Sequence, residues 1–381
     1  MKIFREIVRV IKQFLFLPKN ITNFFLGNFF NDYFLSKYKR EYSGSLSLGK
    51  KVIIYLLFLE NGLSKSHLRT LKYFIKEKYS PIIVSNKPLS AEDKDRLLKK
   101  CWTLIERKNF GYDAGGHRDA ILFLSGKISS LDNLILLNDS TWFPITRDDS
   151  YLNFIKNSNL DFIGATSHYG FERLKLPSNR EDLKKTINFN YNKNFHYASY
   201  ALSFSNKILK NEGFLNFWRT LKLSGTKNIA VRRWEIGITQ FVINNKNFSH
   251  GSFINSKKIA HILKNFSRDT LIKISKESII EHKALKKFKE KFLTNLDSLS
   301  KDEIINFIII LVSRQIIVFS LIKFLIEELN FPFLKKILFR FDKECSKKTY
   351  KIIDKLDRDI FEEIYTDIKN NKSLNKFLEL N

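Results

Sequence analysis

Short apolar runs alternate with amphipathic stretches from residue 51 onward, and this alternation is the strongest structural signal in the chain. A continuous apolar run of about four to eight residues is typical of a strand covered on both faces, whereas apolar positions three or four residues apart indicate a helix. The predicted strands are 52–59, 81–85, 102–105 and 134–137, and the predicted helices between them are 64–78, 90–100 and 116–124. This alternation predicts an α/β domain with a mostly parallel sheet and right-handed crossovers.

The alternation is less regular after residue 140. The predicted elements there are a helix over 148–157, strands at 161–164 and 197–203, a helical pair over 205–221 broken at Gly213, and a helix over 234–242. Beyond about residue 265 the sequence changes to charged helical segments without glycine. We therefore expect a main domain over 49–264, preceded by an amphipathic segment over 1–48 and followed by a helical region over 265–381.

The N-terminal segment has the pattern of a basic amphipathic helix. Residues 1–17 place apolar side chains on one helical face and Arg5, Arg9 and Lys12 on another, and Pro18 is expected to end the helix. Such a helix either packs on its own domain or lies in the plane of an anionic membrane. The sequence leaves both alternatives open.

Two further segments bear on the domain organisation. Residues 42–49 are rich in Ser and Gly and are predicted to be a linker. Residues 304–326 are strongly apolar, but their longest uninterrupted apolar run, 307–312, is well short of the ~20 residues that a membrane span needs. A second amphipathic helix, either packed or membrane-lying, is the prediction there.

Composition and charge narrow the class of protein. A hydrophobic content of 44% excludes a disordered chain, and a formal net charge of +27 favours anionic partners such as nucleotide phosphates, anionic lipid or acidic glycans. A basic motif interleaved with aromatic residues is absent from the sequence, so nucleic acid is not the expected partner. Cys101 and Cys345 lie far apart without metal-like spacing, which fits a reducing compartment. No small-residue cleavage site follows the N-terminal apolar stretch, so a secretory signal is not expected.

Two polar clusters follow predicted strands and are the first candidates for chemistry. Residues 109–116 include Asp113 and three glycines, and residues 138–140 read Asn-Asp-Ser. Ligands of open α/β sheets bind outside the carboxyl ends of the strands, so both clusters predict a ligand site. Glycines let backbone approach a ligand, and Asp139 suits a metal or ribose contact, although an ordinary turn also uses Gly and Asp.

Other candidates are less specific. Glu235 lies at the start of a predicted helix, where a carboxylate is favourable by only ~0.3–1 kcal/mol without any catalytic role. His196 and Ser199 are close in sequence, but no nucleophile-elbow motif surrounds the serine, so a covalent hydrolase is not expected. Three further histidines, His168, His250 and His261, occur singly in polar sequence. One of them could complete the ligand set of a metal ion, and the sequence does not show which.

Five short elements, taken in order over residues 50–250, together resemble the rhamnan synthesis protein F family. These elements are Asn109-x-Gly111-x-Asp113-x-Gly115, Leu136-Leu137-Asn138-Asp139-Ser140 with Pro144, His196-x-x-Ser199-Tyr200, Phe214-x-x-Phe217-Trp218, and Trp234-Glu235-Ile236-Gly237. Members of that family are bacterial glycosyltransferases that build rhamnose-containing and related surface polysaccharides. The resemblance implies a GT-A-like, Rossmann-like domain with flanking helices.

The resemblance also implies roles for individual residues. Asn138-Asp139-Ser140 would replace the acidic metal-binding motif of GT-A enzymes, with Asp139 as ligand of Mg²⁺ or Mn²⁺ and Asn138 and Ser140 as donor contacts. Asn109, Gly111 and Asp113 would line the pocket for the donor nucleotide, and Glu235 would be the catalytic base. His196, Ser199 and Trp234 would belong to an acceptor or donor pocket. The sequence departs from the family pattern at Ala198, where a glutamine is common, and in having one carboxylate at 138–140.

These observations predict a cytoplasmic glycosyltransferase, peripheral on the inner face of the cell membrane. It would transfer a sugar, rhamnose being one candidate, from a nucleotide-sugar donor to a growing cell-surface polysaccharide or lipid-linked glycan acceptor. The basic charge is consistent with an anionic membrane surface as a further partner. The alternative is a non-catalytic, membrane-associated scaffold of a polysaccharide assembly pathway, which would bind no donor.

Overall fold

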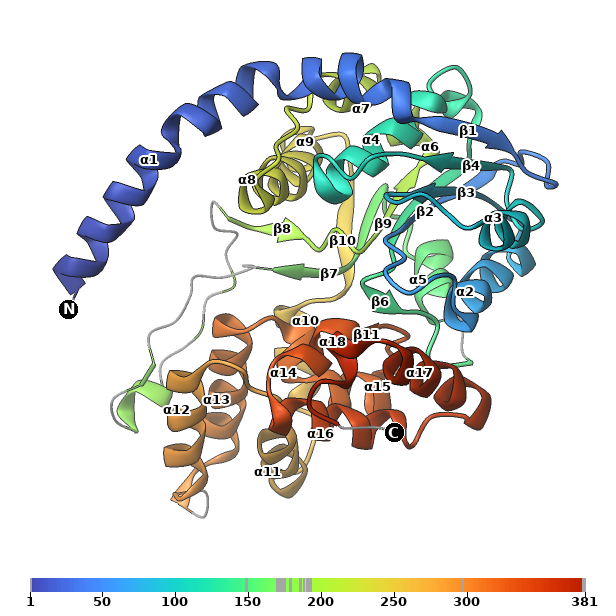
Figure 1. Cartoon of the computed structure of the whole chain (residues 1–381). Helices are drawn as coiled ribbons and strands as arrows, with labels where there is room; N and C mark the ends of the chain where they lie inside the picture. The colour runs from blue at the N-terminus through green and yellow to red at the C-terminus, as the bar shows by residue number, and fades with distance from the viewer. Residues whose placement is uncertain are drawn as a thin grey trace. The chain divides into compact units, whose positions relative to one another are not determined.

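The computed structural model describes residues 2–147, 150–168, 176, 177, 180–184, 187, 189, 194–295 and 298–378 (Figure 1). The chain divides into two compact units, and each takes segments from several parts of the sequence. Unit 1 comprises Met1–Gly62, Glu77–Asn138 and Phe204–Asn245, and unit 2 comprises Leu63–Lys76, Asp139–Ser203 and Lys246–Asn381. The boundaries expected near residues 48 and 264 stay predictions.

Unit 1 is built on a mostly parallel sheet. Its strands, in spatial order, are β1 (Arg40–Ser43), β4 (Thr103–Glu106), β3 (Tyr79–Ser85), β2 (Lys51–Leu57) and β5 (Asn133–Asn138). Strand β2 pairs in parallel with β3 and β5, and β3 pairs in parallel with β4. Every residue of β3 and all but the first of β2 are buried, as continuous apolar runs require. The predicted α/β class with a mostly parallel sheet is confirmed.

Helices cover this sheet, and α4 (Tyr112–Phe123) is the one that matters most for the site. It packs on β2 and β3 and also contacts two later helices, α7 (Glu212–Thr220) and α8 (Lys227–Val231). The remaining helical segments of unit 1 beyond its N-terminus are α3 (Ala91–Leu98), η3 (Ile128–Ser130), α6 (Asn206–Leu209), η5 (Arg232–Ile236) and α9 (Gly237–Asn244). The predicted helical pair over 205–221 is confirmed as α6 and α7, but the break precedes Gly213, because Asn211 caps α7 by accepting a hydrogen bond from the Gly213 N–H.

The N-terminal segment differs from the prediction in two places. Helix α1 (Lys2–Phe29) continues through Pro18 instead of ending there. The expected linker over 42–49 begins with the end of β1, whose residues pair antiparallel with β4. The polar composition of β1 suits an edge strand with only one neighbour, which explains why it lacked an apolar run.

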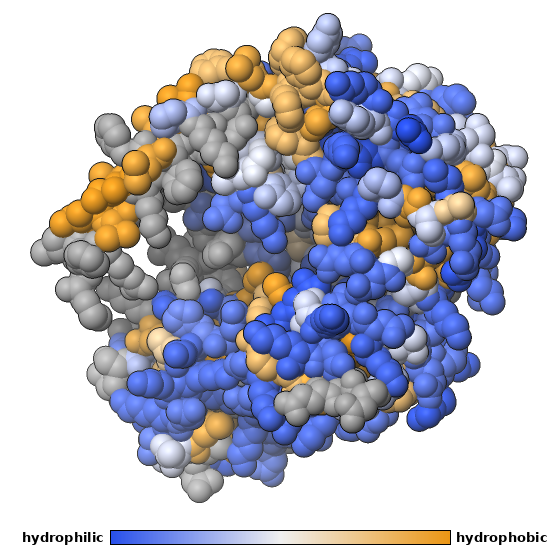
Figure 2. All heavy atoms as spheres, viewed as in Figure 1, coloured by the Kyte–Doolittle hydropathy of each residue, from blue (hydrophilic) through white to orange (hydrophobic). Residues whose placement is uncertain are grey.

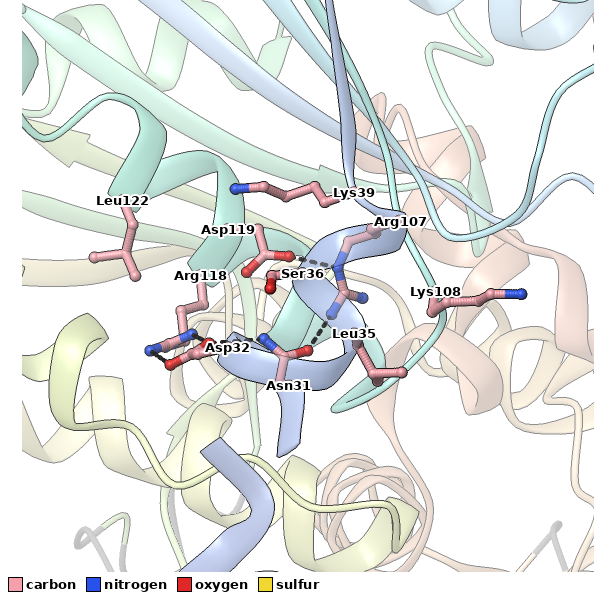
Figure 3. A pocket seen from close by; sticks show the side chains of 10 residues that line it. All are labelled: Asn31, Asp32, Leu35, Ser36, Lys39, Arg107, Lys108, Arg118, Asp119 and Leu122. Carbon is pink, nitrogen blue, oxygen red and sulfur yellow. Dashed lines mark hydrogen bonds and ion pairs between the residues drawn. The ribbon is translucent and has the colours of Figure 1, made fainter. Parts of the chain in front are cut away.

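The end of the N-terminal segment is fixed to α4 by charged side chains (Figure 3). After α1 the chain forms the turns η1 (Phe30–Leu35) and η2 (Ser36–Tyr38). Arg118 of α4 donates to both carboxylate oxygens of Asp32, at 2.7 and 2.8 Å, and buried Arg107 bonds to Asn31 and Asp119. These side chains line a pocket of about 220 Å³. Its two buried arginines, Arg107 and Arg118, already form ion pairs with Asp119 and Asp32.

Many of the side chains of α1 that the structure describes are apolar and exposed to solvent. Leu15 and Phe25 are 73% and 68% exposed, and Figure 2 shows apolar residues along this helix. Helix α13 (Lys301–Arg314), in unit 2, shows the opposite, because its residues 304, 305 and 307–312 are all buried. The single helix predicted for residues 304–326 is wrong in extent, because the segment is divided among α13, α14 (Ile317–Ser320) and α15 (Ile322–Leu329). Most of its apolar side chains are buried, as the packed alternative requires. Within the described residues, no helix combines the length and apolarity needed to cross a bilayer.

Unit 2 combines short strands with many helices. Strand β7 (Phe162–His168) pairs in parallel with β10 (His250–Ile254) and antiparallel with β8 (His196–Tyr197). The two-residue strand β6 (Thr141–Trp142) pairs antiparallel with β11 (Leu334–Lys335). Its other elements are α2 (Lys65–Lys76), α5 (Ser150–Asn157), η4 (Glu181–Lys184), α10 (Ser256–Leu263), α11 (Arg268–Glu277), α12 (Lys283–Leu293), α14 (Ile317–Ser320), α15 (Ile322–Leu329), η7 (Lys336–Arg340), α16 (Lys343–Ile353), α17 (Arg358–Asn370) and α18 (Lys372–Asn375). Strand β9 (Ala201–Ser205) contains the boundary between the units in sequence.

Candidate functional site

The turn between β4 and α4 is shaped by glycine. Gly111 precedes α4 with a φ of +79°, a left-handed conformation that side chains other than glycine rarely adopt. A Cβ at Gly115 would lie 2.1 Å from the Phe110 carbonyl oxygen, so the helix can start here only without a side chain. The helix therefore begins at Tyr112 rather than at residue 116, and Asp113 lies in its first turn. Asn109, also predicted as a donor contact, is exposed in the preceding loop.

Asp113 and Asn138, which come from the two predicted clusters, are in direct contact. The Asn138 Nδ2 donates to Asp113 Oδ2 at 2.8 Å, which joins the start of α4 to the carboxyl end of β5. The Oδ1 of Asn138 is 2.7 Å from Nε2 of His117, one turn further along α4. Because Asn138 Oδ1 can only accept, His117 donates from Nε2.

His117 is fully buried and neutral. Burial lowers the pKa of His117 to about 4, although its hydrogen bond with Asn138 opposes this shift. Its ring lies 5.6 Å from that of Trp234, which in turn lies 4.9 Å from Trp218. Trp234 is 1% exposed, so it belongs to the core behind His117, and its predicted contact with a ligand stays a prediction.

Glu235 follows Trp234 in a π-helical turn, η5. It is partly buried, and its backbone carbonyl accepts a hydrogen bond from the Thr239 hydroxyl at 2.8 Å. Single π-helical turns are found frequently at functional sites, because they displace side chains from the regular helical positions. The local geometry is therefore compatible with the predicted role of Glu235 as base, which stays a prediction.

Asp139 belongs to unit 2, where it faces a histidine that the sequence did not indicate. The Nε2 of His67, on α2, lies 4.0 Å from Asp139 Oδ2, and the two side chains are 8% and 16% exposed. The Ser64 N–H donates to His67 Nδ1 at 3.1 Å, so the proton of the neutral ring is on Nε2, toward Asp139. Burial, together with the charge of Lys336, holds the pKa of His67 well below its usual range.

Ser140 is exposed at the same turn and lies beside a lysine from the far end of the sequence. Pairing of β6 with β11 aligns Lys335 with Thr141, and the Lys336 N–H donates to the Ser140 carbonyl at 3.1 Å. The Lys335 Nζ lies 3.4 Å from Ser140 Oγ and 3.8 Å from the centre of the Tyr200 ring. Within unit 2, Lys335 thus contacts both Ser140, a predicted donor contact, and Tyr200, which follows the predicted pocket residue Ser199 in the sequence.

His196 and Ser199 also lie in unit 2. His196 is partly buried in β8, and its ring lies 5.3 Å from that of His168 in an edge-on arrangement. Burial, and then the charges of His196 and Lys335, lower the pKa of His168 to about 3. Ser199 is 6% exposed. Side chains that are partly or fully buried can orient a sugar hydroxyl, and this role stays a prediction.

The residues at Asp139 do not form a ready-made metal centre. Nowhere in the described part of the chain do three His, Cys, Asp or Glu side chains gather in a group that could hold a metal ion. Mg²⁺ is commonly held by one or two carboxylates together with substrate phosphates, so a single aspartate is a weak ligand set by itself. The side chains beside the turn are a neutral imidazole and a lysine. The metal role of Asp139 stays a prediction, and we derive no step through a metal.

Three residues of these networks escaped the sequence analysis. His117 was detectable, since Asp113 and His117 are spaced i, i+4 and therefore share one helical face. His67 and Lys335 gave no local signal, because only long-range pairing brings them to the Asp139–Ser140 turn.

Comparison with known proteins identifies related sequences. The model of the rhamnan synthesis protein F family matches residues 81–369. An uncharacterized protein of Sinorhizobium fredii, y4gN, is 29% identical over 251 residues, which cover 63% of this chain and 57% of the relative. The virulence protein VirA of Vibrio anguillarum is 25% identical over 197 residues, which cover 50% of this chain and 56% of VirA. The chain therefore spans little more than half the length of these relatives.

Two solved structures show a distant likeness. Core-mannan synthase A from Aspergillus fumigatus, in its Mn/GDP form, is 12% identical with a TM-score of 0.28, over 51% of this chain and 69% of that one. The mannosyltransferase Ktr4p from S. cerevisiae is 12% identical with a TM-score of 0.27, over 52% and 66% of the two chains.

Proposed function

The chain belongs to the rhamnan synthesis protein F family, and on this premise we propose that it is a glycosyltransferase. Its donor would be a nucleotide sugar, with rhamnose as one candidate sugar, and its acceptor a growing cell-surface polysaccharide or lipid-linked glycan. A GT-A-like arrangement of the catalytic domain is part of the proposal.

One observation supports this proposal most directly. The Asn138 side chain, at the carboxyl end of buried strand β5, is hydrogen-bonded to Asp113 in the first turn of α4, at 2.8 Å. Strand ends and helix N-termini are the places where α/β folds bind nucleotides and their phosphates. Asp113, Asn138 and the exposed Asn109 are therefore suited to contact the nucleoside of a donor.

The proposed chemistry is displacement at the anomeric carbon. A hydroxyl of the acceptor attacks that carbon and loses its proton to Glu235, while the bond to the nucleoside diphosphate breaks and its electron pair stays on the diphosphate oxygen. The base must be a different group from those that hold the diphosphate. In this proposal Glu235 is the base and Asp139 belongs to the groups that hold the diphosphate. Asp139 would anchor the diphosphate end through a divalent cation.

We also propose that the enzyme docks on the cytoplasmic face of the membrane through α1. The exposed apolar residues of that helix include Leu15 and Phe25, at 73% and 68% exposed. Residues 1–29 carry five Lys or Arg residues and one Glu, a charge balance that favours anionic lipid. The bonds of Asp32 and Asn31 to Arg118 and Arg107 fix the base of this segment to unit 1.

The first experiment measures donor binding and slow donor hydrolysis. The full chain would be titrated with dTDP-rhamnose and a panel of UDP- and GDP-sugars, with Mg²⁺ or Mn²⁺ and again with a chelator. Selection of one donor over the others is the expected result, and the chelator arm decides whether a cation is needed. If the folded chain, supplied with vesicles, binds no donor, the scaffold alternative replaces the enzyme.

Membrane docking has its own test. Co-sedimentation with phosphatidylglycerol vesicles should exceed that with phosphatidylcholine vesicles, and the double variant Leu15→Glu, Phe25→Glu should weaken binding by about tenfold or more. Phe58→Glu, which alters a partly exposed aromatic residue outside α1, is the matched control and should bind as the unaltered chain does. Equal binding by both variants would contradict the docking role of α1.

A further inference from the structure

We propose that Lys335 and Lys336 form an anion-binding seat at the Asp139–Ser140 turn, which takes the diphosphate of a nucleotide ligand. This inference rests on the proposed function, because it names residues that would hold the leaving group of the same reaction. No recognisable motif surrounds these lysines in the sequence, and they lie outside the five elements from which the family resemblance was drawn.

Backbone pairing fixes the position of the two lysines. Lys335 is aligned with Thr141 in the β6–β11 pair, and the Lys336 N–H donates to the Ser140 carbonyl at 3.1 Å. The backbone at Ser140 and at the residues that follow it is therefore tied to the segment that carries the lysines. A lysine whose backbone is held by strand pairing loses less conformational freedom when it binds a ligand than a lysine on a mobile loop does.

The Lys335 ammonium is directed to the turn by two contacts. Its Nζ lies 3.4 Å from Ser140 Oγ, and the Tyr200 ring lies beneath it at 3.8 Å from Nζ to the ring centre. Tyr200 is buried, and its hydroxyl is 3.1 Å from Thr166 Oγ1, so the ring is itself held in place. A cation seated on an aromatic face keeps its charge and can still donate to an anion.

Lys336 is bonded to the same turn through its backbone. Its Nζ is 5.6 Å from the centre of the Trp142 ring, and its charge reaches His67, whose Nε2 faces Asp139 at 4.0 Å. The turn thus holds the Lys335 ammonium beside the Ser140 hydroxyl, and Lys336 adds a second positive charge on the adjoining residue. Ammonium groups and a hydroxyl are donors that bind phosphate oxygens.

The anion-binding seat would act in the step in which the diphosphate leaves and negative charge develops on it. As the bond between the anomeric carbon and the diphosphate oxygen breaks, negative charge accumulates on the diphosphate, and positioned cations stabilise that charge. A single carboxylate at 138–140 cannot do so without a bound cation, whereas a lysine can. The arrangement therefore assigns to protein side chains a share of the charge neutralisation that a metal supplies elsewhere.

Calorimetric titration of the full chain with inorganic pyrophosphate, and with GDP, UDP and dTDP, tests this assignment in the presence of a chelator. Lys335→Gln should weaken pyrophosphate and nucleoside diphosphate binding by about tenfold, the loss expected for one charge-assisted hydrogen bond. Lys335→Arg, which keeps the charge and the contact with Tyr200, should retain most of the affinity. Lys347→Gln removes an exposed lysine of α16 and should change nothing.

The outcomes separate this inference from the proposed function. Transfer activity with undiminished pyrophosphate binding in Lys335→Gln would overturn the seat and leave the transferase standing. Pyrophosphate binding that depends on Lys335, in a chain that transfers no sugar, would keep the seat and overturn the transferase. Absence of pyrophosphate and nucleotide binding in the unaltered chain would overturn the seat. A melting temperature equal to that of Lys347→Gln shows that the effect of Lys335→Gln is not a loss of fold.

Discussion

Asn138 and Asp139 are consecutive residues, yet their side chains belong to networks of different kinds. Asn138 is 3% exposed and bonds to Asp113 and to the neutral, buried His117, all of which come from the strand and helix that flank one loop. Asp139 faces His67 from α2, and the next residue contacts Lys335. The first network is local, buried and held by neutral donors, whereas the second is long-range and charged.

The two networks differ in what they can do for a ligand. The Asn138 network fixes the positions of its side chains, whereas the charged turn can bind an anion. A largely buried hydrogen-bond network, such as the one that joins Asn138 to Asp113 and His117, is rigid because each lost hydrogen bond leaves an unsatisfied group. A partly exposed turn lined with charges remains open to an anionic ligand. We therefore expect variants of the second network to lose activity more than stability, and variants of the first to lose stability as well.

The largest effect is expected from Asp139→Ala. Removing the carboxylate from the charged turn should reduce transfer to about a thousandth or less, the scale associated with a lost electrostatic contact in a transition state. The melting temperature should change little, because Asp139 is not part of the apolar core. Turnover of the selected donor, measured beside thermal unfolding, checks both statements.

Unchanged turnover in Asp139→Ala would remove this residue from the mechanism and end the functional distinction between the two networks. Asp302→Ala is the matched control, since it removes an exposed carboxylate on α13, outside the turn. We expect it to retain most of the activity.

A smaller loss of activity is expected from Glu235→Gln. The variant should bind donor normally and transfer about a hundredfold more slowly, because proton transfer contributes roughly that much or more in general base catalysis. Donor affinity by calorimetry and single-turnover transfer rates separate the two steps. Full activity would show that the base lies elsewhere, and weakened donor binding would place Glu235 in the pocket instead.

The smallest effect concerns stability and sharpens the description of the first network. Burial lowers the pKa of His117 to about 4 in the folded state. Between that value and the ordinary pKa of ~6.5, the unfolded chain binds the proton and the folded chain does not, so stability falls as the pH falls through this window. From pH 7 to pH 5 the loss due to His117 is about 2 kcal/mol.

Urea unfolding at the two pH values measures this loss. His117→Gln, which keeps a donor for Asn138, should be less stable at pH 7 but should lose about 2 kcal/mol less between pH 7 and pH 5. His261→Gln, at an exposed position on α10, should behave as the unaltered chain does. A His117 variant with the full pH dependence would show that the imidazole is charged in the folded chain.

The sequence was sufficient to predict the part of the molecule that depends on neighbouring residues. The buried strands β2, β3 and β5 follow from continuous apolar runs, and the position of both polar clusters at strand ends follows from the same pattern. The direct bond between Asp113 and Asn138 was not predicted. The start of α4 was placed too late, because glycine at 115 and 116 disguised its first turn.

The rest could not be predicted for physical reasons. Strands β6 and β11 each have two residues, too few to show a period, so nothing local indicated that Lys335 pairs with Thr141. The proline rule failed at Pro18, where helix α1 continues. The apolar residues of α1 and α13 are alike in sequence, and only the structure shows that those of α13 are buried while Leu15 and Phe25 are exposed.

The pairing of β6 with β11 has a consequence for biosynthesis. Ser140 and Lys335 are 195 residues apart, so the turn leaves the ribosome long before its partner strand exists. At a synthesis rate of roughly 5–20 residues per second, that interval is roughly 10–40 s. During this time Trp142 and Phe143, both buried in the finished protein, lack the strand and the Phe333 ring that later cover them. A nascent chain stalled before residue 334 would expose these aromatic side chains, which makes this segment a natural site for chaperone binding until synthesis passes β11.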